Sequence, residues 1–195
     1  MVAREYNPSL DEMQALAIDH ISRSVRNKRK AMHAPALSIQ GESVAPRTVI
    51  LRAFDEVDRQ CVFHTDFRSQ KIASLQQSKI AFLHAYDRRS QLQLRMMGEI
   101  SLEYDNSLTR SWWQRLSPYG RNIYCTSLKP GSMMDEPVSS QTDNQKSDDD
   151  LGYQHFSVLR FTIIQLECLL LGRGRQHRSL HEWTDNELLQ HWLVP

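Results

Sequence analysis

The sequence lacks the features that define several large classes of protein. Its three cysteines, Cys61, Cys125 and Cys168, are widely spaced and form no CxxC pair, which argues against a zinc site or a disulfide framework. It contains no GxGxxG fingerprint, no P-loop and no GxSxG elbow. Rossmann-type dinucleotide enzymes, P-loop NTPases and α/β-hydrolases are therefore disfavoured. No HxxxH pair falls on an expected helix, so no metal site is expected.

The sequence also lacks signals for export, for membrane insertion and for polyanion binding. The first ten residues contain no apolar region of the kind found in signal peptides, and no apolar run approaches the roughly 20 residues that span a bilayer. The net charge is +1 over 195 residues, whereas general nucleic-acid binders are usually far more basic. We expect a cytoplasmic protein of one domain, without nucleic-acid or membrane partners.

Helical patterns are few and lie mainly at the start and in the second half of the chain. Apolar residues recur at helical spacing over residues 9–30, where Ser9 and Glu12 form a capping-box pattern. The basic cluster at 26–30 fits either a nucleic-acid patch or, preferably, a solvated last turn that complements the helix dipole. Shorter helices are expected at 71–77, 109–116 and 119–127, one helical turn at 185–191, and a mobile loop at 129–152.

The remaining segments alternate with the period of β-strands. Strands are expected at 36–40, 47–52, 61–65, 80–86, 90–104 and 155–171, and Gly98 marks a bulge or a barrel corner. Strands that follow one another at short intervals favour an antiparallel barrel or sandwich over a parallel sheet. The expected fold class is mainly β with flanking helices.

One constellation of polar residues suggests an anion site. Arg47 and Arg52 flank an apolar strand, and arginine offers a planar donor fork suited to phosphate. Ser69 and Lys71 lie where a turn becomes a helix, so a hydroxyl, an ammonium and backbone N–H groups are expected to converge there. By spacing alone, ordinary surface residues are the more common explanation. His64 and Gln93 have equally plain structural explanations, a satisfied imidazole and a solvent-facing amide.

The order of these residues resembles a known family. Arg47-Thr48-Val49-Ile50-Leu51-Arg52, Phe63-His64-Thr65, Ser69-Gln70-Lys71 and the segment from Gln93 to Gly98 follow one another as in the pyridoxamine 5'-phosphate oxidase-like family. The similarity is greatest to the branch described as pyridoxamine 5'-phosphate oxidase-related, FMN-binding. The basic segment at 175–178 and the final Leu-Val-Pro also resemble the end of family members.

The resemblance implies a split β-barrel homodimer with two FMN sites at the subunit interface. Arg47 and Lys71 would bind the flavin phosphate, and Gln93 would meet the edge of the isoalloxazine ring. Arg52, Arg175 and His177 would contact the substrate. The cofactor-binding set implied by the family pattern is Arg47, Thr48, Val49, Ile50, Leu51, Arg52, His64, Thr65, Ser69, Gln70, Lys71, Gln93 and Arg178.

The sequence departs from the true oxidase at several places. Arg52 stands where the oxidase has a substrate-binding lysine, and the substrate-phosphate motif is reduced to Arg115-Leu116-Ser117-Pro118-Tyr119. The tryptophan expected before the final Leu-x-Pro is replaced by Leu188. These residues favour an FMN-dependent oxidoreductase acting on an unidentified small molecule. The alternatives are a true pyridoxamine or pyridoxine 5'-phosphate oxidase and a non-catalytic flavin- or haem-binding module.

Overall fold

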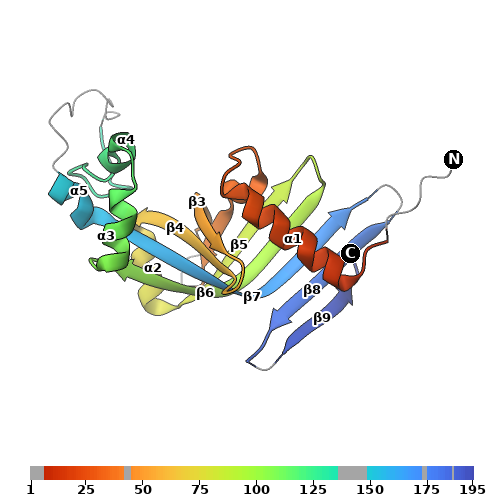
Figure 1. Cartoon of the computed structure of the whole chain (residues 1–195). Helices are drawn as coiled ribbons and strands as arrows, with labels where there is room; N and C mark the ends of the chain where they lie inside the picture. Colours follow the sequence, from red (N-terminus) through yellow and green to blue (C-terminus); the bar gives the residue numbers. More distant parts are fainter. Residues whose placement is uncertain (1–6, 42–44, 136–148, 173–174, 186) are drawn as a thin grey trace.

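One antiparallel sheet dominates the structure (Figure 1). The computed structural model describes residues 7–41, 45–135, 149–172, 175–185 and 187–195. Within them the hydrogen-bonded strand order is β2-β1-β5-β6-β7-β4-β3, and β8 joins β7 to β9. The nine strands are β1 (Ala36–Ile39), β2 (Arg47–Thr48), β3 (Leu51–Asp55), β4 (Gln60–Asp66), β5 (Ile80–Asp87), β6 (Leu92–Tyr104), β7 (Phe156–Leu171), β8 (Gln176–Trp183) and β9 (Leu188–Leu193).

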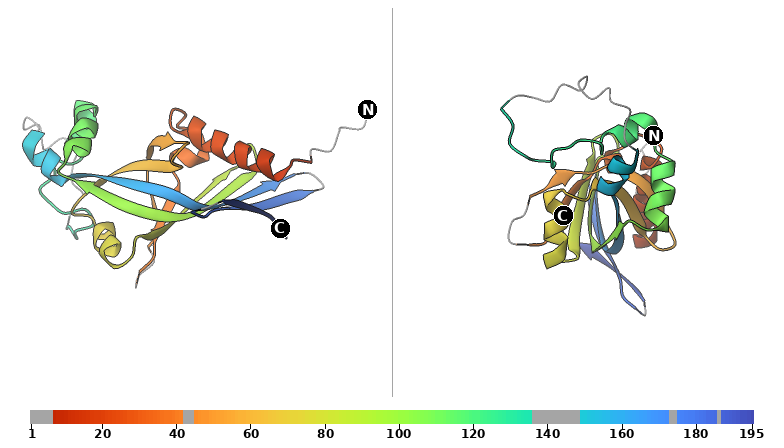
Figure 2. Two further views of the ribbon diagram at one scale, coloured as in Figure 1. Left: turned by 60° about the horizontal axis from the view of Figure 1, so that its bottom comes forward. Right: turned by 90° about the vertical axis from the view of Figure 1, so that its left-hand side faces the viewer.

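Five α-helices accompany the sheet within the described residues. Helix α1 (Leu10–Ser24) lies across it, and the expected capping box is present because Ser9 and Glu12 each accept the other's backbone N–H. Helices α3 (Ser107–Gln114), α4 (Pro118–Asn122) and α5 (Asp149–His155) gather at one end, and α2 (Gln70–Gln77) follows β4. Figure 2 shows β6 and β7 running from this helical end to the opposite end, where β8 and β9 lie.

The expected strand at 47–52 is wrong in one respect, because the chain leaves one part of the sheet and joins another. Arg47 and Thr48 form β2 and pair with β1, whereas Leu51 begins β3 and pairs with β4, at the opposite end of the strand order. Between them the Val49 N–H donates to the carbonyl of Pro35. This crossing turns the two arginines toward different surroundings.

Three other expected boundaries need correction. Helix α1 ends at Ser24, and an Asn27 side chain that accepts the Arg29 N–H organises a turn before Lys30. The expected helical turn at 185–191 is wrong, because β9 pairs there with β8. The expected loop at 129–152 falls partly outside the described residues, and its last four residues belong to α5.

The core lies between α1 and the inner face of the sheet. Met13, Ala17 and Ile21 of α1 are completely buried against apolar side chains from β1, β5, β6 and β7. The bulge expected at Gly98 is present as a register shift between Met97 and Gly98. A Cβ at Gly98 would lie 2.1 Å from the Thr162 carbonyl oxygen, so glycine is required for this close approach. Among the described helices, none is long and apolar enough to cross a bilayer.

Candidate functional site

A lysine and two hydroxyls converge where β4 passes into α2. The Lys71 ammonium donates to Thr65 Oγ1 at 2.6 Å and to Ser69 Oγ at 3.0 Å. Thr65 and Ser69 are both buried. Ser69 is the N-cap residue of α2, as expected, but its hydroxyl makes no capping hydrogen bond and faces Lys71 instead. We call Arg47, Thr65, Ser69 and Lys71 the Lys71 cradle.

The Lys71 cradle holds more positive charge than it can neutralise. Burial, and then the charge of the nearby Arg47 guanidinium, lower the pKa of Lys71 to about 8. Arg47 donates from Nε to the Ala45 carbonyl and pairs with no carboxylate among the described residues. Asp66 is the one carboxylate that raises the pKa of Lys71. An anion placed between Lys71 and Arg47 would remove this repulsion.

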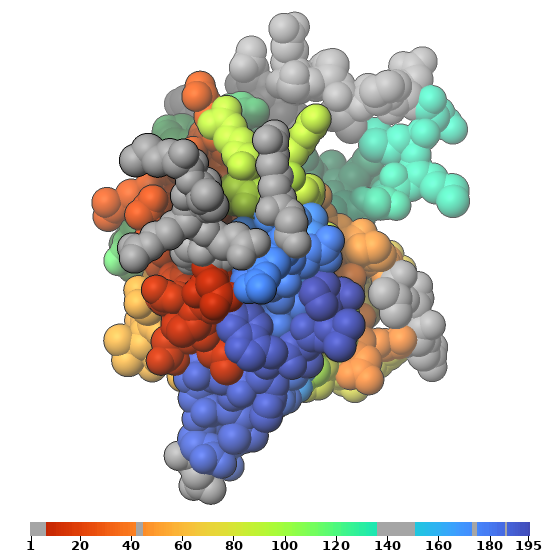
Figure 3. Space-filling view, turned by 90° about the vertical axis from the view of Figure 1, so that its right-hand side faces the viewer, coloured from red at the N-terminus to blue at the C-terminus, as the bar shows by residue number. Residues whose placement is uncertain are grey.

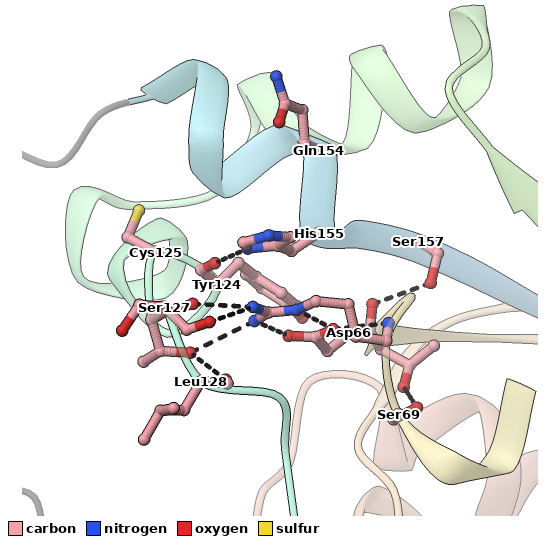
Figure 4. A network of polar contacts seen from close by, with 12 residues as sticks. Asp66, Ser69, Tyr124, Cys125, Ser127, Leu128, Gln154, His155 and Ser157 are labelled. Carbon is pink, nitrogen blue, oxygen red and sulfur yellow. Dashed lines mark hydrogen bonds and ion pairs between the residues drawn. The ribbon is translucent and has the colours of Figure 1, made fainter. Parts of the chain in front are cut away.

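Asp66 is already engaged by another arginine. Arg68 Nη2 lies 2.7 Å from Asp66 Oδ2, and Arg68 Nη1 donates to the carbonyls of Thr126 and Ser127. Figure 4 shows this network from close by, with Asp66 beside Ser127 and Tyr124. Arg68 therefore ties the loop after α4 to the turn that carries Ser69. Because Asp66 pairs with Arg68, it offsets the positive charge of the Lys71 cradle only in part.

His64 points away from the Lys71 cradle, because neighbouring residues on a strand face opposite sides. Its ring makes edge contacts with Trp112 and Phe156 at centroid distances of 5.1 and 5.0 Å. Both ring nitrogens are buried, and neither has a hydrogen-bond partner among the described residues. Burial, and then the charge of Arg52, lower the pKa of His64 to about 3. The imidazole is thus neutral at physiological pH, and the expectation of a satisfied imidazole is wrong.

The residues from Arg47 to Arg52 differ in whether their side chains are buried in the core or exposed to solvent. Val49 and Leu51 bury their side chains in the core, so only their backbone can face a ligand. Thr48 and Arg52 are exposed, and Ile50 is half-buried. Arg52 lies close enough to His64 and Tyr124 to affect both pKa values. It therefore belongs to the aromatic side of β4, and Arg47 to the cradle side. Gln70, the first residue of α2, is exposed beside the cradle.

The other expected site residues lie at the far end of the sheet. Gln93 sits on β6 between Tyr86 of β5 and Leu169 of β7. Arg178 of β8 is committed to Glu167, with a Nη2–Oε1 distance of 3.0 Å, and also donates to the Val194 carbonyl. Arg175 and His177 line a depression of about 610 Å³ together with Trp192 and residues 7–10.

The structure does not bring these two groups of residues together within one chain. Thr65 pairs with Ser157 of β7, and Gln93 pairs with Leu169 of the same strand. The positions 157 and 169 are twelve residues apart (169 − 157), which corresponds to about 40 Å along a strand. One small ligand cannot touch both groups in a single protomer.

Sequence reasoning missed several residues of the helical end. Trp113 is buried, and Trp112 is half-buried over His64. Tyr124, whose pKa burial raises to about 12, packs against Trp113 and Phe156. Adjacent tryptophans were the only sequence signal for this aromatic cluster. Tyr124 follows a helix too short to have a recognisable apolar face.

Comparison with known proteins identifies the region that contains the Lys71 cradle. Residues 14–103 match the family model of the pyridoxamine 5'-phosphate oxidase, FMN-binding domain. The resemblance to the pyridoxamine 5'-phosphate oxidase-like family is therefore confirmed. The match covers the cradle, Arg52, His64 and Gln93, but not helices α3–α5 or strands β7–β9. No curated protein sequence matches the chain.

Solved structures extend the likeness to the whole chain. A pyridoxamine 5'-phosphate oxidase-related, FMN-binding protein from Nostoc punctiforme is 25% identical, with a TM-score of 0.73 over 97% of this chain and 100% of that one. PhzG from Burkholderia lata, in complex with tetrahydrophenazine-1-carboxylic acid, gives the same TM-score at 17% identity over the full length of both chains. The fold is thus the FMN-binding split barrel, as the sequence predicted.

Proposed function

We propose that this protein binds FMN and holds the flavin phosphate in the Lys71 cradle. The observation that carries the proposal is the uncompensated pair of Lys71 and Arg47, set beside two buried hydroxyls. Phosphate matches such a site, because it accepts several charge-assisted hydrogen bonds at once. The first N–H groups of α2 supply further donors. The family match to an FMN-binding domain supports the same assignment.

We propose that the flavin ring lies along residues 48–51 and reaches a second protomer. Val49 and Leu51 offer only backbone groups to a ring, whereas an amide such as Gln93 can hydrogen-bond its polar edge. Because Gln93 and Arg178 lie far from the cradle in one chain, they would come from the partner in a homodimer. In an isologous dimer, one two-fold axis relates the two protomers, so both flavin sites would form from the same pair of surfaces.

The outward face around Gln93 has the character expected of such an interface. Phe82 and Tyr86 on β5 are 45% and 44% exposed. They point to the same side of the sheet as Gln93 on β6, because Tyr86 and Gln93 are directly paired. Exposed aromatic residues on a sheet face favour association with another protein surface.

The activity we propose is an oxidation or reduction of a small molecule. FMN supplies hydride and electron transfer when bound. The chain would contribute orientation and charge: Arg52 would pair with an anionic group of the substrate, and Arg175 and His177 of the partner would close the site. The neutral His64 and the aromatic rings above it would exclude water on that side.

The decisive experiment for the cofactor is purification of matched variants. Replacing Arg47 and Lys71 with alanine removes charge-assisted hydrogen bonds of about 1.5–3 kcal/mol each, so the protein should lose its flavin. Lys79→Ala is the control, since Lys79 is exposed just after α2 and outside the cradle. Absorbance near the flavin bands and mass identification of the released ligand measure occupancy. Stoichiometric flavin in the Arg47→Ala/Lys71→Ala protein would disprove the phosphate assignment.

Two alternatives to this activity can be separated with the purified flavoprotein. Anaerobic bleaching by pyridoxamine 5'-phosphate, with formation of the pyridoxal product, would identify a true pyridoxamine phosphate oxidase. Reduction by a nicotinamide cofactor without that product supports the oxidoreductase of another small molecule. Bound flavin that no reductant or substrate changes would indicate a non-catalytic binding module.

A further inference from the structure

Basic residues of this chain differ in whether they pair with a carboxylate. Ion pairs between described residues include those of six arginines: Arg23, Arg68, Arg95, Arg110, Arg160 and Arg178. A second set is exposed and pairs with no carboxylate among the described residues: Arg26, Lys28, Arg29, Arg88, Arg89 and Arg175. We call this second set the basic end. Other exposed basic residues without a carboxylate partner among the described residues, namely Arg52, Lys79, Arg115 and Lys129, lie on separate segments, whereas the basic end gathers six.

The members of the basic end come from three neighbouring segments. The turn after α1 reaches β5, because Lys30 lies 3.7 Å from Asp87. The β5–β6 turn carries Arg88 and Arg89, and it adjoins the end of β7 through a hydrogen bond from the Leu171 N–H to the Gln91 carbonyl. Figure 3 looks at this end, where the yellow-green β5–β6 turn projects beside the orange-red residues that follow α1.

Two of these segments, the turn after α1 and the β5–β6 turn, line an open pocket of about 530 Å³, which lies in the size range of small-molecule sites. Its lining includes Arg29, Arg88, Arg89 and the half-exposed ring of Tyr86. Asp87 is the one carboxylate among the lining residues, and it is already occupied. Its Oδ1 accepts the backbone N–H groups of Arg89 and Ser90, and its Oδ2 faces Lys30 and His20. Asp87 therefore fixes the turn without neutralising the three arginines.

We propose that this pocket binds a nucleotide that carries two or more phosphates. Guanidinium groups bind phosphate oxygens in pairs, and three uncommitted arginines around one pocket match a polyphosphate better than a single anion. The exposed Tyr86 ring offers a surface on which a planar base stacks. A pocket bounded by two turns fits a small ligand, whereas nucleic acid needs a longer basic track. The proposal uses neither the Lys71 cradle nor Gln93, and it requires that the dimer proposed above leave the Tyr86 ring accessible at its edge.

The test is a titration of the FMN-saturated protein with ADP, measured by isothermal titration calorimetry. We expect saturable binding that Arg88→Ser/Arg89→Ser weakens by at least about tenfold, because charge-assisted hydrogen bonds are lost. Arg23→Ser/Arg110→Ser changes the net charge equally outside the pocket and should bind ADP as the wild type does. Tyr86→Ala should weaken ADP by at least about fivefold and leave the affinity for inorganic pyrophosphate unchanged.

Other outcomes would overturn the proposal. If both arginine double variants lost ADP affinity equally, the binding would depend on the net charge of the protein and not on this pocket. Loss of ADP binding in Lys71→Ala, with retention in Arg88→Ser/Arg89→Ser, would place the nucleotide in the Lys71 cradle. Single-stranded DNA that binds more tightly than ADP at equal phosphate concentration would make the basic end a nucleic-acid surface. Unfolding temperatures within a few degrees of the wild type would show that the variants are folded, so these results are interpretable.

Discussion

The surroundings of Lys71 indicate an anion-binding site even without a bound ligand. The ammonium is buried beside two hydroxyls and faces a second cation, so its protonated form is disfavoured. Such an arrangement is unfavourable for an empty protein and becomes favourable with an anion. The pKa of Lys71 should therefore rise when phosphate binds.

The stability of the flavin-free protein should depend on pH because of the lowered pKa of Lys71. Its folded-state pKa of about 8 lies below the ordinary lysine pKa of 10.5, so between these pH values the unfolded chain binds the additional proton. The free energy of unfolding should therefore increase from pH 8 to 10.5, relative to Lys71→Met. Urea denaturation of both proteins across this range measures the difference. A constant difference across the range would contradict the lowered pKa.

His64 makes a prediction of the same sign at lower pH, because its neutral ring is buried without hydrogen bonds. Replacing it with phenylalanine removes two unsatisfied polar atoms from an aromatic cluster and should leave stability at pH 7 unchanged or higher. Below pH 6.5 the unfolded chain protonates this histidine first, so the wild type should lose stability relative to His64→Phe as the pH falls toward 3. Thermal unfolding from pH 7 to pH 4 tests this, and a destabilised variant at pH 7 would reveal a missing partner.

At the scale of the elements, local patterns predicted the fold best where one face is buried. The alternation in β4, β5 and β6 and the helical spacing of α1 were sufficient, because each buries a regular row of apolar side chains. β9 was missed, since this strand is stabilised chiefly by pairing with β8 and has no buried residue. The break at Val49 and Ile50 was missed because it depends on two pairing partners distant in sequence.

The same reasoning applies to the candidate site. The sequence placed Arg47, Ser69 and Lys71 together, because a strand end and a helix start have predictable geometry. It could not place Trp112 over His64 or Arg68 on the loop after α4, because these contacts depend on tertiary packing. Family resemblance supplied the flavin, which spacing alone did not.

The bulge in β6 gives a prediction at this scale. A methyl group at Gly98 would collide with the Thr162 backbone, which cannot move without disturbing β7. Gly98→Ala should therefore destabilise the protein by at least about 2 kcal/mol. Gly41→Ala is the matched control, because its Cβ would meet only a flexible glutamine side chain at 3.3 Å. Denaturant midpoints report both changes, and equal midpoints would refute the steric argument.

At the scale of the whole molecule, the Lys71 cradle and the region of Gln93 and Arg178 lie at opposite ends of the sheet. We call these two regions the half-sites, and the proposed flavin site needs both. If the flavin contacts the cradle of one protomer and Gln93 and Arg178 of the other, two defective proteins can complement each other. Arg47→Ala/Lys71→Ala and Gln93→Ala/Arg178→Ala should each fail to hold FMN. After mixing with exchange of subunits, about a quarter of all sites should be intact, because each mixed dimer contains one complete site.

Flavin absorbance after removal of free FMN measures this recovery, and light scattering reports the mass of the assembly. A monomer, or a mixture that remains colourless although mixed dimers form, would show that the site is not shared. Recovery in the mixture but not in either parent would locate the two halves on different protomers.

Strand β7 contacts both half-sites through its two ends, with Ser157 beside Thr65 and Leu169 beside Gln93. Because side chains alternate along a strand, a slip of one residue would reverse every side chain that it presents. In the proposed dimer, one insertion or deletion in β7 would therefore damage both proposed flavin sites simultaneously. The length of β7 sets the position of both half-sites, so it should tolerate less variation than the lengths of the loops around it.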